Sequence, residues 1–247
     1  MNITRTSNPA LGRESFTKDV VSDGTTMTVK GAMNKTLILF AFLLVSAIVS
    51  WKMTISGNVL GSTLIIPAAI GALVLGIVTT FAKKAAKITG PLYAICEGFV
   101  LGALSSLFEA AYSGIIFQAI ALTLLVFGLM LFLYKTGILK ASGKFVKGGF
   151  VATMAIGIFY LVSFIASFFT SAISEYLFAN PLIGIIVSLV IVVIAALNLI
   201  LDFDFIEQSA NSGAPKYMEW YAGYGLMVTL VWLYIEILRL LSYLRRD

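Results

Sequence analysis

The sequence predicts an all-α, polytopic membrane protein in which seven transmembrane helices form one bundle. Hydrophobic residues make up 60% of the 247 positions, charged residues make up 12%, and the mean hydropathy is +0.99. A soluble domain is typically about 45–50% apolar and about 25% charged. The apolar runs also lack the polar face that helices of a soluble bundle carry. The composition therefore excludes an ordinary soluble domain, and no nucleic-acid partner is expected from the net charge of +5.

Seven apolar runs are each about as long as the ~20 residues that a bilayer-spanning helix needs. They lie near residues 36–56, 60–82, 90–111, 113–134, 149–173, 181–202 and 220–244. The third and fourth runs are separated only by the short YSG stretch at 112–114, which predicts a tight helical hairpin. Residues 36–247 are thus expected to form the transmembrane domain. The polar, Ser- and Thr-rich residues 1–35 are expected to be a disordered tail.

The basic residues predict the orientation of the chain. Thirteen of the 17 Lys and Arg residues fall in the tail and in the loops after the second, fourth and sixth runs: Arg5, Arg13, Lys18, Lys30, Lys35, Lys83, Lys84, Lys87, Lys135, Lys140, Lys144, Lys147 and Lys216. Since cytoplasmic loops carry the excess of positive charge, the N-terminus and these loops are expected to be inside. Arg245 and Arg246 leave open whether the seventh run crosses completely.

Few chemical groups are available for catalysis or metal binding. Cys96 is the only cysteine and there is no histidine, so an intrachain disulfide, a Cys metal cluster and a histidine pH switch are excluded. The common nucleotide-binding and hydrolase motifs are also missing. The sequence indicates neither an enzyme nor a resident cofactor, and any proton sensing near neutrality would depend on carboxylates or amines.

Acidic residues inside apolar runs are the strongest functional signal. An ionisable side chain at the bilayer centre costs at least about 2.5 kcal/mol and usually faces a partner or water. Glu97 lies within the third run and Glu236 lies deep in the seventh. Glu97 precedes Gly98 and Gly102, a spacing that allows helices to approach closely. Glu97 is therefore either part of a packing surface or part of an ion pathway, for which Asp204 is the other candidate.

Glu236 and Asp202 each have a simpler structural explanation. Arg239 follows Glu236 by one helical turn and could neutralise it locally as a counter-charge. Asp202 closes the sixth run on the same helix face as Asn198. Asp204 and Glu207 are expected to be charges of the aqueous loop beyond that helix.

The stretches GPLYAICEGFVLGALSS (90–106), DFDFIE (202–207) and WLYIEILRLLSYL (232–244) resemble the transmembrane Bax inhibitor motif family, in a longer bacterial-type branch. The similarity extends from about residue 35 to 246. It implies a seven-helix bundle whose last helix is central. It also implies a pH-sensitive calcium leak, gated by acids on the sixth and seventh helices.

By these motifs the two gating acids, and any calcium ligands, are Asp202 and Glu236, with Asp204 as the alternative register on the sixth helix. The family has a basic partner on its second helix, for which the candidates here are Lys83, Lys84 and Lys87. Two adjacent carboxylates in a low-dielectric site would share a proton, and carboxylate oxygens are suitable ligands for Ca²⁺.

Three functions remain in competition. The first is a pH-gated leak for calcium, with lipid, calcium ions and protons as its partners. The second is a proton-coupled transporter that uses the same acids, and the third is a non-transporting regulator that contacts membrane proteases or cell-death proteins. The expected location is the bacterial inner membrane, with the N-terminus in the cytoplasm.

Overall fold

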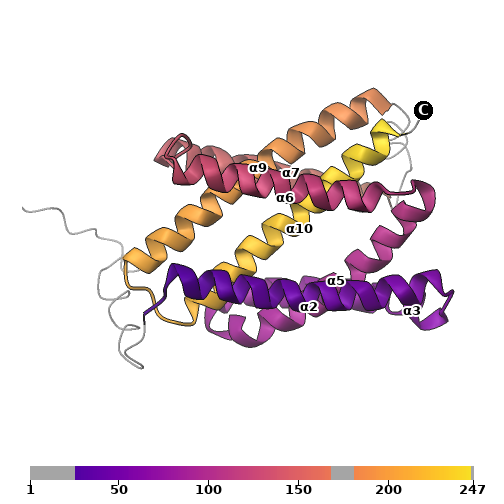
Figure 1. Cartoon of the computed structure of the whole chain (residues 1–247), viewed down its shortest axis with the longest axis horizontal. Helices are drawn as coiled ribbons and strands as arrows, with labels where there is room; N and C mark the ends of the chain where they lie inside the picture. The colour runs from indigo at the N-terminus through magenta and orange to yellow at the C-terminus, as the bar shows by residue number, and fades with distance from the viewer. Residues whose placement is uncertain (1–25, 168–180, 246–247) are drawn as a thin grey trace, which may run out of the picture.

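The computed structural model describes residues 26–167 and 181–245, and these residues form a bundle of long helices (Figure 1). The elements are α2 (Val29–Ile55), α3 (Val59–Thr63), α4 (Ile65–Phe81), the 3₁₀ helix η1 (Lys83–Ala85), α5 (Ala86–Ala111), α6 (Ile115–Lys135), α7 (Gly143–Ser167), α9 (Pro181–Asn211) and α10 (Met218–Leu244). Seven helices are long and apolar enough to cross a membrane when α3 is counted with α4 and η1 with α5. The predicted all-helical, seven-span class is confirmed.

Helix α2 begins earlier than the sequence pattern predicted. The Thr28 hydroxyl caps it by accepting a hydrogen bond from the N–H of Gly31 at 2.9 Å, so the helix starts at Val29. The boundary proposed at residue 35 therefore falls inside a helix, because a cap can start a helix among polar residues before the apolar run. Residues 1–25 of the predicted tail, and 168–173 of the fifth run, lie outside the described residues.

The second span is broken near its start, which hydropathy alone does not reveal. Helix α3 ends at Thr63 and α4 resumes at Ile65. Pro67 accounts for this position, since proline has no N–H to donate to the carbonyl four residues earlier and its ring clashes with that carbonyl. The carbonyl four residues before Pro67 belongs to Thr63.

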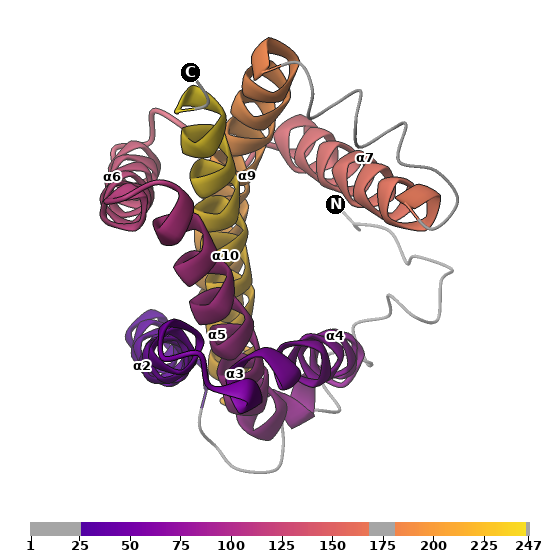
Figure 2. The same cartoon turned by 90° about the vertical axis from the view of Figure 1, so that its right-hand side faces the viewer.

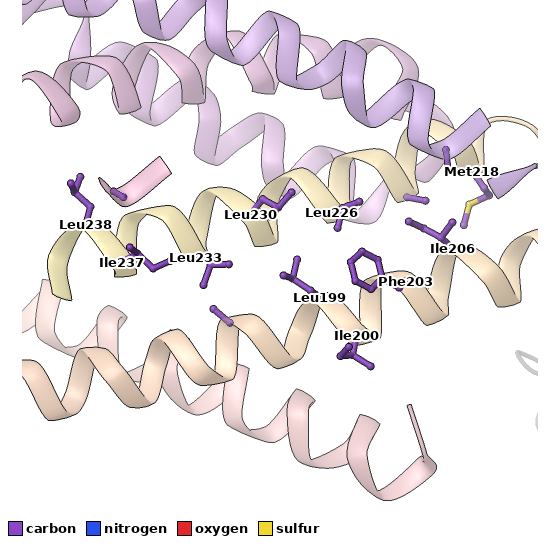
Figure 3. Close-up of a cluster of buried hydrophobic side chains, with 14 of the residues drawn as sticks. Leu199, Ile200, Phe203, Ile206, Met218, Leu226, Leu230, Leu233, Ile237 and Leu238 are labelled. Atoms are coloured by element: carbon purple, nitrogen blue, oxygen red, sulfur yellow. The ribbon is translucent and has the colours of Figure 1, made fainter. Parts of the chain in front are cut away.

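Helix α10 has the largest share of buried residues among the seven described spans. It packs against α9, α2, α6 and α5, whereas α4 packs mostly on α5 and α7 packs on α9. The end-on view shows α7 standing apart from the α2–α5 side of the molecule (Figure 2). Between α9 and α10, the buried side chains of Leu199 and Phe203 face Leu226 and Leu233 (Figure 3). The central place expected for the last helix is thus observed, although α4 and α7 are attached mostly through their neighbours.

Helices α2 and α5 approach so closely that two glycines are required. A Cβ on Gly98 would lie 2.2 Å from the carbonyl oxygen of Leu43, and one on Gly102 would lie 2.1 Å from that of Ala47. Small residues at a four-residue spacing permit this type of backbone contact in membranes. The close approach predicted from the Gly98 and Gly102 spacing is confirmed.

Helix α10 runs the whole length of the bundle. At its start, Lys83 lies over the Tyr221 ring at 5.3 Å, and the N–H of Met27 donates to the carbonyl of Ala214 at 2.7 Å. At its end, Arg245 donates to the carbonyl of Ser113 at 2.8 Å, in the turn between α5 and α6. The seventh span therefore reaches the end of the bundle opposite to its start, where Arg245 is hydrogen-bonded.

Candidate acid sites in the bundle

Glu236 is buried at the junction of α7 and α10. Its side chain is 1% exposed and its Oε1 accepts a hydrogen bond from the hydroxyl of Tyr160 on α7. Arg239, one turn further along α10, donates to the same hydroxyl at 2.6 Å and lies 3.4 Å from Glu236 Oε1. The local counter-charge proposed from the sequence is present, and Tyr160 links it to another helix.

Asp202 lies on the side of α9 that is turned toward α10. Its carboxyl lies near the hydroxyl of Thr229, which donates a hydrogen bond to the carbonyl of Gly225 at 3.3 Å. The residue is half-buried, but its Oδ2 is fully buried and has no hydrogen-bond partner. A buried carboxylate oxygen without a donor costs roughly 1–3 kcal/mol or more, so this atom is a candidate position for a proton or a cation.

The two candidate gating acids have separate partners in this structure. Thr229, which marks the level of Asp202 on α10, precedes Glu236 by seven residues. At 1.5 Å per residue this offset is about 10 Å along the helix axis. The predicted proton-sharing contact between Asp202 and Glu236 therefore requires another arrangement of the helices, and it stays a prediction.

The candidate basic residues lie near the start of α10. Lys83 and Lys84 are stacked over the rings of Tyr221 and Tyr217, at 5.3 Å and 6.0 Å from the ring centroids, while Lys87 is exposed. Tyr221 precedes Glu236 by fifteen residues, which is about 22 Å of helix. A lysine latch on the acids stays a prediction for another arrangement.

The assignment of Asp204 and Glu207 to an aqueous loop is wrong. Helix α9 continues to Asn211, nine residues beyond the predicted end of the run. Asp204 accepts a hydrogen bond from Gln208 at 2.6 Å, and Glu207 accepts one from the hydroxyl of Tyr134 at 2.6 Å. The helix persists because Phe203 and Ile206 of this polar stretch remain buried in the core.

Two acids escaped the sequence analysis as structural residues. Glu219 is 1% exposed and accepts hydrogen bonds from the backbone N–H and hydroxyl of Thr28, both at 3.0 Å. Glu109, near the end of α5, accepts from the N–H groups of Gly114 and Ile116 at 2.6 and 3.2 Å and so caps α6. Glu219 follows a lysine by three residues, a helical ion-pair spacing that was the available signal.

Glu97 lies in a pocket that is separate from the other acids. The pocket has a volume of about 390 Å³ and lies between α4, α5 and α10, with Tyr93 and Tyr224 beside the carboxyl. Asp202, Asp204 and Glu236 do not line it. The structure therefore separates Glu97 from the other candidate of the ion pathway, Asp204.

Calcium has no complete ligand set in this arrangement. The described residues contain no group of three or more acidic or cysteine side chains that could hold a metal ion. Calcium takes six to eight oxygen ligands, and Asp202 and Glu236 have separate partners here, so calcium binding or passage at these acids stays a prediction.

The fold and these acids define the class of the protein: an integral, multi-pass helical membrane protein with carboxylates buried among its spans. The family model described as Bax inhibitor 1 like matches residues 8–246, nearly the whole chain, and the chain belongs to this family. Comparisons with curated proteins and with solved structures gave no match.

Proposed function

We propose that this protein is a pH-sensitive cation leak with calcium as a permeant ion, gated by Asp202 and Glu236. The observation that carries the proposal is the Oδ2 of Asp202, which is buried without a hydrogen-bond donor at the α9–α10 contact. A proton or a passing cation would compensate this oxygen. Binding of a proton or a cation at this oxygen can therefore change the free energy of the contact between α9 and α10.

Glu236 supplies the second part of the gate. Its carboxylate, the guanidinium of Arg239 and the hydroxyl of Tyr160 form one cluster that connects α7 to α10. Protonation would remove the negative charge that pairs with Arg239 and would weaken the hydrogen bond that Tyr160 donates. In the described range of α7 no residue is buried, so this helix can shift with little loss of packing.

A change at this cluster could also bring the two acids closer. Both lie on the α7–α9–α10 side of the bundle, and Asn198 on α9 already contacts Thr153 on α7 at 2.9 Å. A shift of α7 and α9 along α10 would alter the polar contacts of both acids together. Protonation would then bias a packing that has two arrangements, which is the general basis of a pH switch.

The test is calcium flux into proteoliposomes that contain the purified full-length protein, measured from pH 5 to 8. Asp202→Asn and Glu236→Gln should each flatten the pH dependence, and the double variant should add little because coupled residues are not additive. Glu207→Gln changes an exposed acid on the same helix as Asp202 and should leave the profile unchanged.

Several outcomes would contradict the proposal. A normal pH response in both single variants would exclude the two acids as sensors. Calcium movement against its own gradient when only a proton gradient is imposed would indicate the transporter instead. An absence of flux from the folded protein at every pH would favour a regulator that acts through protein contacts.

A further inference from the structure

A third acid within the spans, Glu97, lies in a pocket that the proposed gate does not use. The carboxyl shares the pocket with the rings of Tyr93 and Tyr224, which meet edge to face with centroids 5.1 Å apart. The Tyr224 hydroxyl donates to the carbonyl of Gly76 at 3.3 Å. One side of the pocket is thus acidic and aromatic.

The rest of the pocket is mostly apolar, with Thr80 as its polar residue, and faces outward. Leu73, Ile77 and Phe81 of α4 line it and are 65%, 51% and 84% exposed. These residues belong to a span that packs mostly on α5, so their exposed surface faces the bilayer. The volume of about 390 Å³ is in the range of small-molecule sites. A ligand could therefore enter sideways from the lipid.

Among the residues that the structure describes, Glu97 has no basic side chain paired with it. Neither the Lys216–Glu219 pair nor the Arg239–Glu236 pair includes it, and the polar side chain next to it is the neutral Tyr93. Glu97 lies eleven residues into α5, about 16 Å from the start of that helix. An unpaired carboxylate this far along a membrane-spanning helix is energetically costly, and its presence therefore indicates a functional site.

We propose that this pocket binds a lipophilic monovalent organic cation, with the charged centre beside Glu97 and the apolar groups against α4. One carboxylate balances one positive charge. Aromatic faces attract weakly hydrated cations, whereas calcium needs six to eight oxygen ligands. The depth in the membrane and the apolar wall both favour a cation that carries its own apolar surface.

The experiment measures binding of tetraphenylphosphonium to the purified full-length protein in nanodiscs by equilibrium dialysis. We expect saturable binding to one site, and Glu97→Gln should raise the Kd at least about ten-fold, equivalent to about 1.4 kcal/mol. Glu109→Gln alters another acid on the same helix, where the amide oxygen can still cap α6, and should bind as the wild type does.

Two further measurements serve as controls. One blocks the pocket without changing the carboxylate, and the other tests whether the probe simply dissolves in the lipid. Ile77→Trp would fill the outer part of the pocket from an exposed position and should also weaken binding, independently of the carboxylate. Tetraphenylborate, an anion of the same shape, should show no saturable binding when it is dialysed alone. Equal affinity of tetraphenylphosphonium for the wild type and both pocket variants, non-saturable uptake, or saturable binding of tetraphenylborate alone would each overturn the proposal. None of these results depends on whether the protein conducts calcium.

Discussion

The carboxylate of Glu219 accepts two hydrogen bonds from Thr28 and so fastens the start of α10 to the start of α2. Both bonds are 3.0 Å long, and Lys216 adds a third at 2.7 Å. The carboxylate occupies the space above Gly31, where a Cβ would lie 1.8 Å from its Oε1. A glycine at position 31 is therefore part of the same contact.

Replacing Glu219 by Ala should destabilise the protein by about 1–3 kcal/mol, because the Thr28 donors would lose a buried acceptor. The measurement is thermal unfolding in detergent. Glu207→Ala is the matched control, since Glu207 is exposed and accepts one hydrogen bond, from Tyr134. Equal melting temperatures for the two variants would show that the Thr28 contact contributes nothing specific.

Gly98→Ala should disrupt the contact between α2 and α5. The new Cβ would lie 2.2 Å from the carbonyl oxygen of Leu43, and backbone cannot move aside as a flexible side chain can. Overpacking of this kind typically costs about 1–3 kcal/mol. Gly128→Ala on α6 meets nothing within 4 Å, so it should be neutral or slightly stabilising. Unfolding of both variants in the same detergent tests the difference, and a loss for Gly128→Ala of the same size would contradict it.

Tyr160→Phe should both weaken the attachment of α7 to α10 and change the pH profile of calcium flux. The hydroxyl that donates to Glu236 and accepts from Arg239 would be lost, while the ring would remain. Thr153→Val removes a different polar contact of α7, with Asn198, and leaves the Glu236 cluster intact. Hydrogen exchange of α7 should rise in both variants, but the pH profile should change only in Tyr160→Phe. A changed profile in both would mean that α7 packing alone controls flux.

The predicted orientation can be tested by labelling single cysteines in a Cys96→Ala background. Lys140→Cys lies in the exposed turn between α6 and α7, and Ser56→Cys lies beyond the end of α2. An impermeant maleimide added to intact cells should label Ser56→Cys and spare Lys140→Cys, because the basic loops are expected inside. Labelling of Lys140→Cys from outside alone would reverse the assignment.

The sequence predicted the spans better than their ends. The count of seven follows from hydropathy, which measures what the bilayer tolerates. The early start of α2 depends on the cap at Thr28, and the extension of α9 to Asn211 depends on the burial of Phe203 and Ile206 by other helices. A hydropathy profile records neither a polar helix cap nor burial against other helices, so both helix ends were placed wrongly.

The site was predictable as a set of residues, but not as an arrangement. The cost of charge in lipid singled out Glu97 and Glu236, and the structure buries Glu236 and places Glu97 in a pocket. Tyr160 and Thr229 carry no charge and lie 76 and 27 positions from the acids that they contact. Only the packing of α7, α9 and α10 brings them there.

The position of α10 has a consequence for how the protein is made. Ribosomes synthesise this helix after the other six described spans, yet α2, α5, α6 and α9 all pack against it. These four spans must therefore enter the bilayer before their shared partner, held by contacts such as the glycine-mediated one between α2 and α5. A chain that terminates before α10 would leave a set of inserted helices for membrane quality control to remove.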